Sequence, residues 1–200
     1  MLAFDHIAVA AATTEAGSAH VERMLGHRPG PGGRHATMGT HNRLLGLGPG
    51  EYLEAIAIDP EAPAPDRPCW FGLDRRDGPP RVAGWVGRVA DLDAALARHP
   101  EAGRPQGFGR DGLRWRMAVP EDGLSPFDGC FPMLIEWQTD GPALPDPGLR
   151  LERLVLRHPE AARLAAMLAA LTDDPRIRCE QGPAAIEARV STPGGSRRLA

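Results

Sequence analysis

Short runs in which apolar and polar residues alternate are separated, along this chain, by segments whose apolar residues recur every three or four positions. The first pattern predicts a β-strand and the second an α-helix. Residues 4–10 therefore form a predicted strand, and a helix capped by Thr13 or Thr14 follows it and ends at Gly26. Three short strands then complete a strand-helix-strand-strand-strand order, at residues 35–40, 42–48 and 52–59.

The same order of elements returns twice more. After a Pro-rich linker, the second unit has a helix capped by Asp91, with strands at 82–90, 113–120 and 133–139 and a weak one near 107–112. The third unit has a helix from Pro159, with strands at 149–158, 176–181 and 185–191. We therefore expect an α+β protein with βαβββ modules at residues 1–60 and 81–140 and an incomplete βαββ unit at 149–200.

Composition narrows the classes of function. All 23 basic residues are arginine, so chemistry that needs a lysine, such as a Schiff base or a P-loop, is excluded. The formal net charge of −3 argues against nucleic acid as a partner. Cys69, Cys130 and Cys179 are far apart and odd in number, which is typical of reduced thiols. Without a signal peptide or a long apolar run, the protein is expected to be cytoplasmic and not to enter membranes.

One carboxylate interrupts an apolar strand. Glu54 shares a strand face with Tyr52, Ile56 and Ile58, where a carboxylate is costly unless it is paired, hydrogen-bonded or bound to a metal. Glu136 is a second such carboxylate, beside Leu134. His6, on the predicted face of Phe4 and Ala8, is a candidate third ligand for a divalent cation. Ion pairs between the glutamates and Arg43, Arg114 or Arg116 are the structural alternative, which spacing alone favours.

Motifs of several other enzyme classes are missing. The chain has no G-x-S-x-G elbow, no H-E-x-x-H, and no G-x-G-x-x-G that opens a helix after a strand. Trp85 and Trp115 lie on predicted strands, where the default role of such large apolar side chains is core packing. Together with arginine side chains in a cleft, they would also suit a planar ligand or an organic anion.

Several stretches resemble the glyoxalase-like branch of the vicinal oxygen chelate superfamily, a widespread group of bacterial proteins. They are "DHIAVA" followed by a helix, "MGTHNRLLGLGPGEYLEAIAI" (38–58), "GWVGRVADLDAA" (84–95) and "LRWRMAVPEDG…FPMLIEW" (113–137). The turn formed by Gly39, Thr40 and Asn42, joined to the "YLE" strand, is the most specific part. The resemblance implies that the two modules pair into a curved mixed sheet shaped like a cup.

The resemblance also implies a site inside that cup. His6, Glu54 and Glu136 fall on metal-ligand positions, and the fourth position falls on Gly84 or Trp85, neither of which binds metal. Asn42, Arg43, Trp85, Trp115 and Arg116 are the expected substrate-binding residues. Such an oxygen-rich ligand set would suit Mn²⁺, Mg²⁺ or Fe²⁺, with Ni²⁺ or Zn²⁺ as further candidates.

Two functions follow from the resemblance. One is a metal-dependent lyase, isomerase or dioxygenase on a small oxygenated substrate, in which Glu54 or Glu136 moves a proton. The alternative is a metal-free protein that binds or sequesters a small molecule, which the missing fourth ligand favours. A third, less favoured alternative is an interaction module in which the residues at the metal-ligand positions form ion pairs instead. A homodimer is expected in each case.

Overall fold

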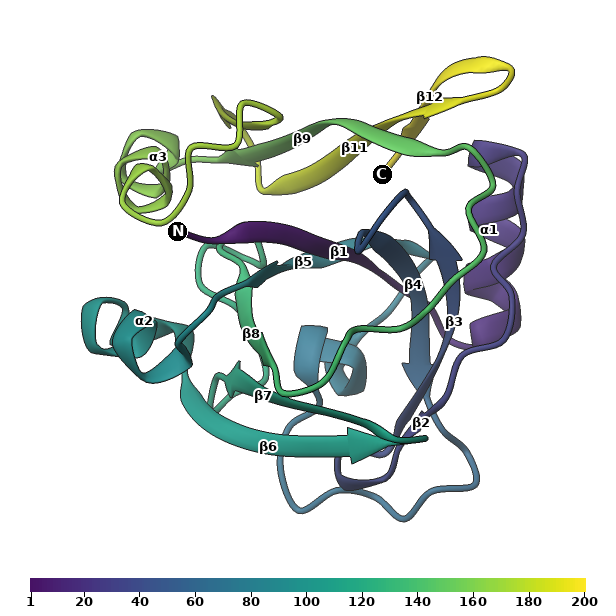
Figure 1. Cartoon of the computed structure of the whole chain (residues 1–200), viewed down its shortest axis with the longest axis horizontal. Coiled ribbons are helices and arrows are strands. Elements are labelled where there is room, and N and C mark those ends of the chain that lie inside the picture. The colour runs from purple at the N-terminus through teal and green to yellow at the C-terminus, as the bar shows by residue number, and fades with distance from the viewer.

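Two β-sheets and three α-helices make up the structure, a computed structural model that describes residues 1–200 (Figure 1). The strand order is β2-β3-β4-β1-β5-β8-β7-β6 in the eight-stranded sheet and β10-β9-β11-β12 in the four-stranded sheet. The eight strands of the large sheet are β1 (Ala3–Ala10), β2 (Arg34–His35), β3 (Thr40–Gly46), β4 (Tyr52–Ile58), β5 (Arg81–Arg88), β6 (Arg104–Arg110), β7 (Leu113–Val119) and β8 (Met133–Trp137). The small sheet contains β9 (Arg150–His158), β10 (Ile177–Gln181), β11 (Ala185–Thr192) and β12 (Gly195–Leu199).

The large sheet is built from two equivalent halves. In each half the first strand pairs in parallel with the last, β1 with β4 and β5 with β8. Antiparallel pairing of β1 with β5 joins the halves, so both modules of the pair come from one chain. The sheet curves into a nearly closed cup (Figure 1), which confirms the predicted α+β fold of paired βαβββ modules. The module boundaries at residues 60, 81, 140 and 149 stay a prediction.

The helices begin where the sequence predicts. The Thr13 hydroxyl accepts a hydrogen bond from the Ala16 amide at the start of α1 (Thr14–Leu25), and Gly26 ends this helix in the left-handed conformation. Asp91 caps α2 (Leu92–Arg98) in the same way. Both helices cover the outer side of the cup, α1 over β3 and β4 and α2 over β6, β7 and β8. The third helix, α3 (Ala161–Ala169), packs on β9 and β10.

Three segments differ from the predicted pattern. Residues 35–40 were expected as one strand, but a 3₁₀ turn, η1 (Ala36–Met38), separates β2 from β3. The Pro-rich linker contains a second 3₁₀ segment, η2 (Trp70–Arg75), in which Phe71 and Gly72 are left-handed. Strand β12 was not predicted, because its sequence "GSRRL" has almost no apolar alternation; it extends the expected βαββ unit by one strand.

Two groups of apolar side chains lie on opposite faces of the large sheet. The larger group, which includes Ile7, Trp85 and Leu134, fills the space between the cup and the small sheet. The smaller group, which includes Trp70 and Trp115, lies inside the cup. Since neighbouring residues of a strand point to opposite faces, β1, β4, β5, β7 and β8 each contribute to both groups.

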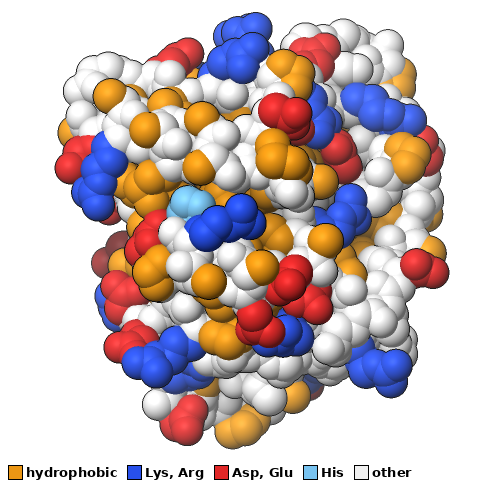
Figure 2. Space-filling model, turned by 60° about the vertical axis from the view of Figure 1, so that its left-hand side comes forward, with side chains coloured by type: hydrophobic (Ala, Val, Ile, Leu, Met, Phe, Trp, Pro, Cys, Tyr) orange, Lys and Arg blue, Asp and Glu red, His pale blue; other side chains and the backbone are white.

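The outer surface is mixed in charge. On the face seen in Figure 2, arginine and acidic side chains are interspersed and no charge of one sign dominates. None of the helices combines the length and the apolar character needed to cross a membrane.

Candidate functional site

A narrow, partly open cavity lies inside the cup, between the two modules. All but two of its 12 lining residues lie on strands of the large sheet, and the two exceptions, Trp70 and Phe71, come from η2. The lining residues are His6, His35, Asn42, Tyr52, Glu54, Trp70, Phe71, Arg110, Trp115, Met117, Ile135 and Trp137.

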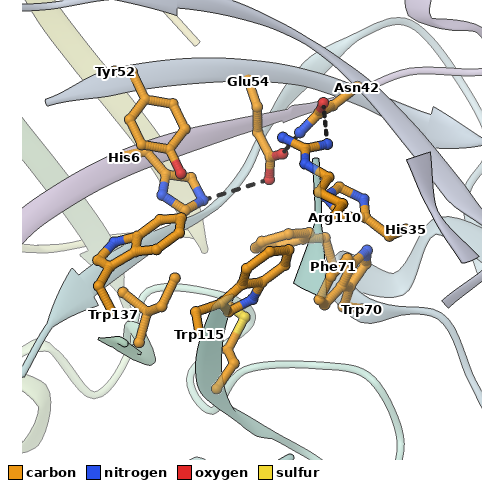
Figure 3. Close-up of a pocket in the computed structure, with 12 residues that line it drawn as sticks. His6, His35, Asn42, Tyr52, Glu54, Trp70, Phe71, Arg110, Trp115 and Trp137 are labelled. Carbon is orange, nitrogen blue, oxygen red and sulfur yellow. Dashed lines mark hydrogen bonds and ion pairs between the residues drawn. The ribbon is translucent and has the colours of Figure 1, made fainter. Parts of the chain in front are cut away.

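Aromatic rings form one wall of the cavity. In Figure 3 the rings of Trp137, Trp115, Phe71 and Trp70 follow one another along the side opposite the Glu54 carboxylate. Trp115 and Trp137 have ring centroids 5.5 Å apart, and those of Trp70 and Phe71 are 6.2 Å apart. Such a wall offers a flat apolar ligand several ring faces and edges to pack against.

A chain of polar contacts forms the opposite wall. His6 Nδ1 donates to Asp5 Oδ1 over 2.7 Å, and His6 Nε2 lies 3.6 Å from Glu54 Oε1. The other Glu54 oxygen, Oε2, accepts a hydrogen bond of 2.6 Å from Asn42 Nδ2. All four residues are buried, so these contacts replace the water that each polar group loses.

A β-bulge turns both Asp5 and His6 toward this wall. The pairing of β1 with β5 shifts between Phe4 and His6, so the strand gains one residue relative to its partner. As a result Phe4 packs with the outer apolar group while Ala8 packs inside the cup. The prediction that Phe4 shares the face of His6 is therefore wrong, whereas Ala8 does share it.

The two inward histidines have opposite protonation states at neutral pH. Burial lowers the pKa of His6, but hydrogen bonds to Asp5 and Glu54 outweigh burial and raise it to about 9. Burial lowers the pKa of His35 to about 4. Although burial raises the pKa of Glu54, its hydrogen bond to His6 and the His6 charge hold it below its usual value. Around pH 7 the cavity thus contains a histidinium, a carboxylate and a neutral imidazole.

The second module reaches across the cavity through one arginine. Arg110, at the end of β6, donates from Nη1 to Asn42 Oδ1 over 3.0 Å. The same Asn42 oxygen accepts from the Gly33 amide, so the Asn42 side chain is held by three groups. This contact ties the β6–β7 hairpin to the β3–β4 hairpin of the first module.

The structure does not bring Glu136 to the cavity. On β8 it is Ile135 and Trp137 that face inward, so Glu136 lies on the outer face. There Glu136 Oε2 accepts from the Leu92 amide at the start of α2 and lies 3.4 Å from Arg116 Nη1. Because strand faces alternate, a one-residue offset in aligning "LIEW" with "YLEA" exchanges the inner and outer positions.

The predicted substrate-binding residues divide in the same way. Asn42 and Trp115 line the cavity. Arg43 follows Asn42 on β3 and is not among the lining residues. Trp85 is fully buried between the two sheets, where Nε1 donates to the Cys130 carbonyl oxygen.

Arg116 is the last of this set, and it also lies outside the cup. Its guanidinium binds the Asp93 carboxylate of α2. Arg116 alternates with Trp115 along β7, so the inward position of Trp115 requires the outward position of Arg116.

The residues present do not fit the implied three-ligand metal site. His6 and Glu54 face one another, but Glu136 is on the other side of the sheet, and no group of three or more His, Cys, Asp or Glu side chains is arranged to hold an ion. On β5, Gly84 faces inward at the position implied for the fourth ligand, and Phe71 packs against it. Apolar packing therefore replaces coordination in that corner.

Several site residues were not predicted from the sequence. Asp5 precedes the predicted ligand His6, and its burial depends on a bulge that no pattern signals. Trp70 and Phe71 lie in a Pro-rich segment that reads as a linker, and Arg110 lies in a Gly-rich stretch where only a weak strand is predicted. His35 lies only four residues before Gly39, in the same hairpin as the turn at Gly39–Asn42, but no pattern singles it out.

Comparison with known proteins places this chain in a family. Residues 4–172 match the model of the glyoxalase-like domain. A hypothetical protein from Staphylococcus aureus has the same fold, with a TM-score of 0.63 and 15% identity over 92% of this chain and 88% of its own. No curated protein is significantly similar in sequence.

More distant structural neighbours are methylmalonyl-CoA epimerases. The enzyme from Mycobacterium tuberculosis is 20% identical, over 67% of this chain and 85% of its own, with a TM-score of 0.44. An epimerase in complex with methylmalonyl-CoA and NH4+ is 18% identical, over 72% of this chain and 99% of its own, with a TM-score of 0.45. The family match covers most of the sequence, and the chain therefore belongs to the glyoxalase-like domain family.

Proposed function

We propose that the protein binds a small planar organic molecule inside the cup and does so without a metal ion. The aromatic wall carries this proposal, because four ring systems from the second module and η2 converge on one cavity. Stacking and edge contacts with such rings favour an unsaturated or aromatic ligand. The polar wall of His6, Glu54 and Asn42 would fix its orientation through hydrogen bonds.

The arrangement of ligands supports the metal-free form of this proposal. Glu136 is engaged by α2 and Arg116, and Phe71 fills the corner of the fourth ligand. Glu54 is likewise occupied by Asn42 and His6. A cytoplasmic location and a homodimer belong to the same proposal. The size of the protein in solution tests the homodimer.

Ligand titration tests the proposal. Benzamide added to protein treated with EDTA should quench tryptophan fluorescence, because Trp70, Trp115 and Trp137 line the cavity. Trp115→Ala should weaken binding about 10-fold or more, the scale of a lost aromatic contact, whereas Trp115→Phe should retain most of it. Equal binding by all three proteins would contradict the proposed wall.

Metal analysis tests the second part of the proposal. Protein offered Mn²⁺, Fe²⁺, Ni²⁺ and Zn²⁺ should retain less than one equivalent of each. Stoichiometric metal that disappears in Glu54→Gln, together with ligand binding that is lost on chelation, would instead establish a metal-dependent site.

A proton-transfer enzyme, such as an isomerase or lyase, is the second candidate. One observation favours it: Glu54 is ionised at neutral pH, since its pKa is lowered by His6, and its carboxylate faces the cavity. It would remove a proton from a carbon next to a carbonyl group, leaving an enolate that the His6 imidazolium stabilises. Deuterium exchange into the methylene group of phenylpyruvate, lost in Glu54→Gln, is the expected result. Exchange no faster than in buffer would exclude this activity for that substrate class.

A further inference from the structure

The charged groups that line the cavity do not balance. Two cations, His6 and Arg110, line the cavity with one carboxylate, Glu54, and Asp5 lies beside His6. Both carboxylates have partners within the chain. Asp5 contacts His6 and the Trp137 indole and lies 3.6 Å from Arg88, and Glu54 contacts His6 and Asn42. Arg110 is the cation that has no carboxylate partner.

Arg110 makes no ion pair. Its single side-chain hydrogen bond goes from Nη1 to the neutral Asn42 oxygen. A guanidinium offers five N–H donors in a planar fork, so most of the donors of Arg110 have no partner in the protein. By contrast, Arg116, on the other face of the sheet, is paired with two carboxylates. An arginine of this kind on the wall of a cavity is suited to an anion from outside.

The route of the Arg110 side chain is built into the backbone. Arg110 pairs with Leu113 across a two-residue turn in which Asp111 and Gly112 are both left-handed, the geometry of a tight hairpin. The side chain then crosses Gly33, where an added methyl group would lie 2.6 Å from Arg110 Nη1. The guanidinium thus passes close to the Gly33 backbone, and its hydrogen bond to Asn42 holds it at the cavity.

Aromatic rings line the cavity near Arg110, and the charge of Arg110 affects His35 on the same cavity. After burial and an opposing effect of Glu54, the charge of Arg110 contributes to the lowered pKa of His35. Trp115 and Phe108 stack near the His35 ring, with centroids 5.8 Å apart. A ligand bound by Arg110 would therefore have a planar part among rings and an anionic end at the guanidinium.

We propose that Arg110 anchors the acid group of the ligand, and that the ligand class is a small aromatic or conjugated monocarboxylate. A carboxylate matches the guanidinium fork with two parallel hydrogen bonds. This inference rests on the proposed function, because it names the ligand class of the same cavity. It adds a residue of the second module to a polar site otherwise formed by the first.

Matched pairs of probes separate the acid group from the ring. Benzoate and phenylacetate are compared with benzamide and phenylacetamide by tryptophan fluorescence titration of the full chain. In the wild type each acid should bind about 10-fold or more tightly than its amide, the scale of a charge-assisted hydrogen bond. Arg110→Gln should remove this preference and leave the amide affinities within about 2-fold. Arg110→Lys should keep part of it, since the charge remains but the fork is lost.

The control and the contradicting outcomes are defined by the same titrations. Arg153→Gln removes an exposed arginine of the small sheet and should leave the preference unchanged. Unaltered amide binding in Arg110→Gln shows that the cavity is intact. Acids and amides that bind equally in the wild type, or a preference that survives in Arg110→Gln, would overturn the role of Arg110 while leaving the proposed function in place. If none of the four probes binds the wild type, both proposals are overturned.

Discussion

Some residues of the site could be predicted from the sequence and others could not. Glu54 and His6 could be singled out because polar residues in apolar strands are visible in the residue pattern, and Asn42 followed from the family resemblance. Asp5 and Arg110 could not. The first is brought inward by a bulge and the second by a hairpin that crosses to the other module. Both depend on pairing between distant strands, which a local pattern does not encode.

The charge of His6 makes stability depend on pH in one direction. The pKa of His6 is about 9 in the folded protein and 6.5 as the ordinary value, so its contribution to the free energy of unfolding is complete below about pH 6.5 and is lost as the pH rises through 9. The contribution is on the order of 3 kcal/mol. Urea unfolding of wild type and His6→Gln should therefore give a difference that shrinks between pH 6.5 and pH 9.5. A constant difference over that range would contradict the ion-paired state of His6.

At the scale of elements, the alternation of strand faces decides which predictions hold. The order of strands and helices follows from hydrophobic periodicity, and the structure confirms it in both modules. The face of a strand is harder to predict, because a one-residue offset reverses every side chain. Arg116 and Glu136 were expected inside the cup for this reason, and they pair with each other on its outer face.

The glycine at the fourth-ligand corner gives a prediction about β5 and η2. An alanine methyl at Gly84 would lie 2.9 Å from Phe71 Cδ1, so Gly84→Ala should push Phe71 into the cavity. Overpacking of this kind costs about 1–3 kcal/mol, and benzamide binding should weaken as well. Gly107→Ala on β6 is the matched control, because no atom lies within 4 Å of its added methyl group. Equal effects of the two substitutions on unfolding and on binding would argue against contact between η2 and β5.

At the scale of the whole molecule, the small sheet shares an apolar core with the outer face of the cup. Its inward residues join those on the outer face of β1 and β5 in one apolar group, which contains Leu154 and Leu156 as well as Phe4 and Trp85. The Leu2 amide also donates to the carbonyl oxygen of Leu171, just after α3. The third unit therefore packs on the outside of the paired modules.

This shared core predicts one cooperative unfolding transition. Leu154→Ala removes a fully buried side chain of β9 and should cost about 2–5 kcal/mol. Tryptophan fluorescence reports mainly on the cup and far-UV circular dichroism on all strands, and both signals should shift together. Arg153→Ala, an exposed neighbour, should change stability by less than about 0.5 kcal/mol. Two separate transitions would show that the small sheet unfolds independently.

Trp70 and Phe71 come from the connection between the modules, whereas every other lining residue belongs to a hydrogen-bonded strand. A loop can change length and sequence more freely than a strand whose backbone is paired on both sides. Exchange of residues 60–80 alone would therefore change part of the aromatic wall while the sheet stays the same. Gene duplication that joins two βαβββ units creates such a connection, which natural selection or a protein engineer can vary to obtain new ligand preferences while the sheet keeps its stability.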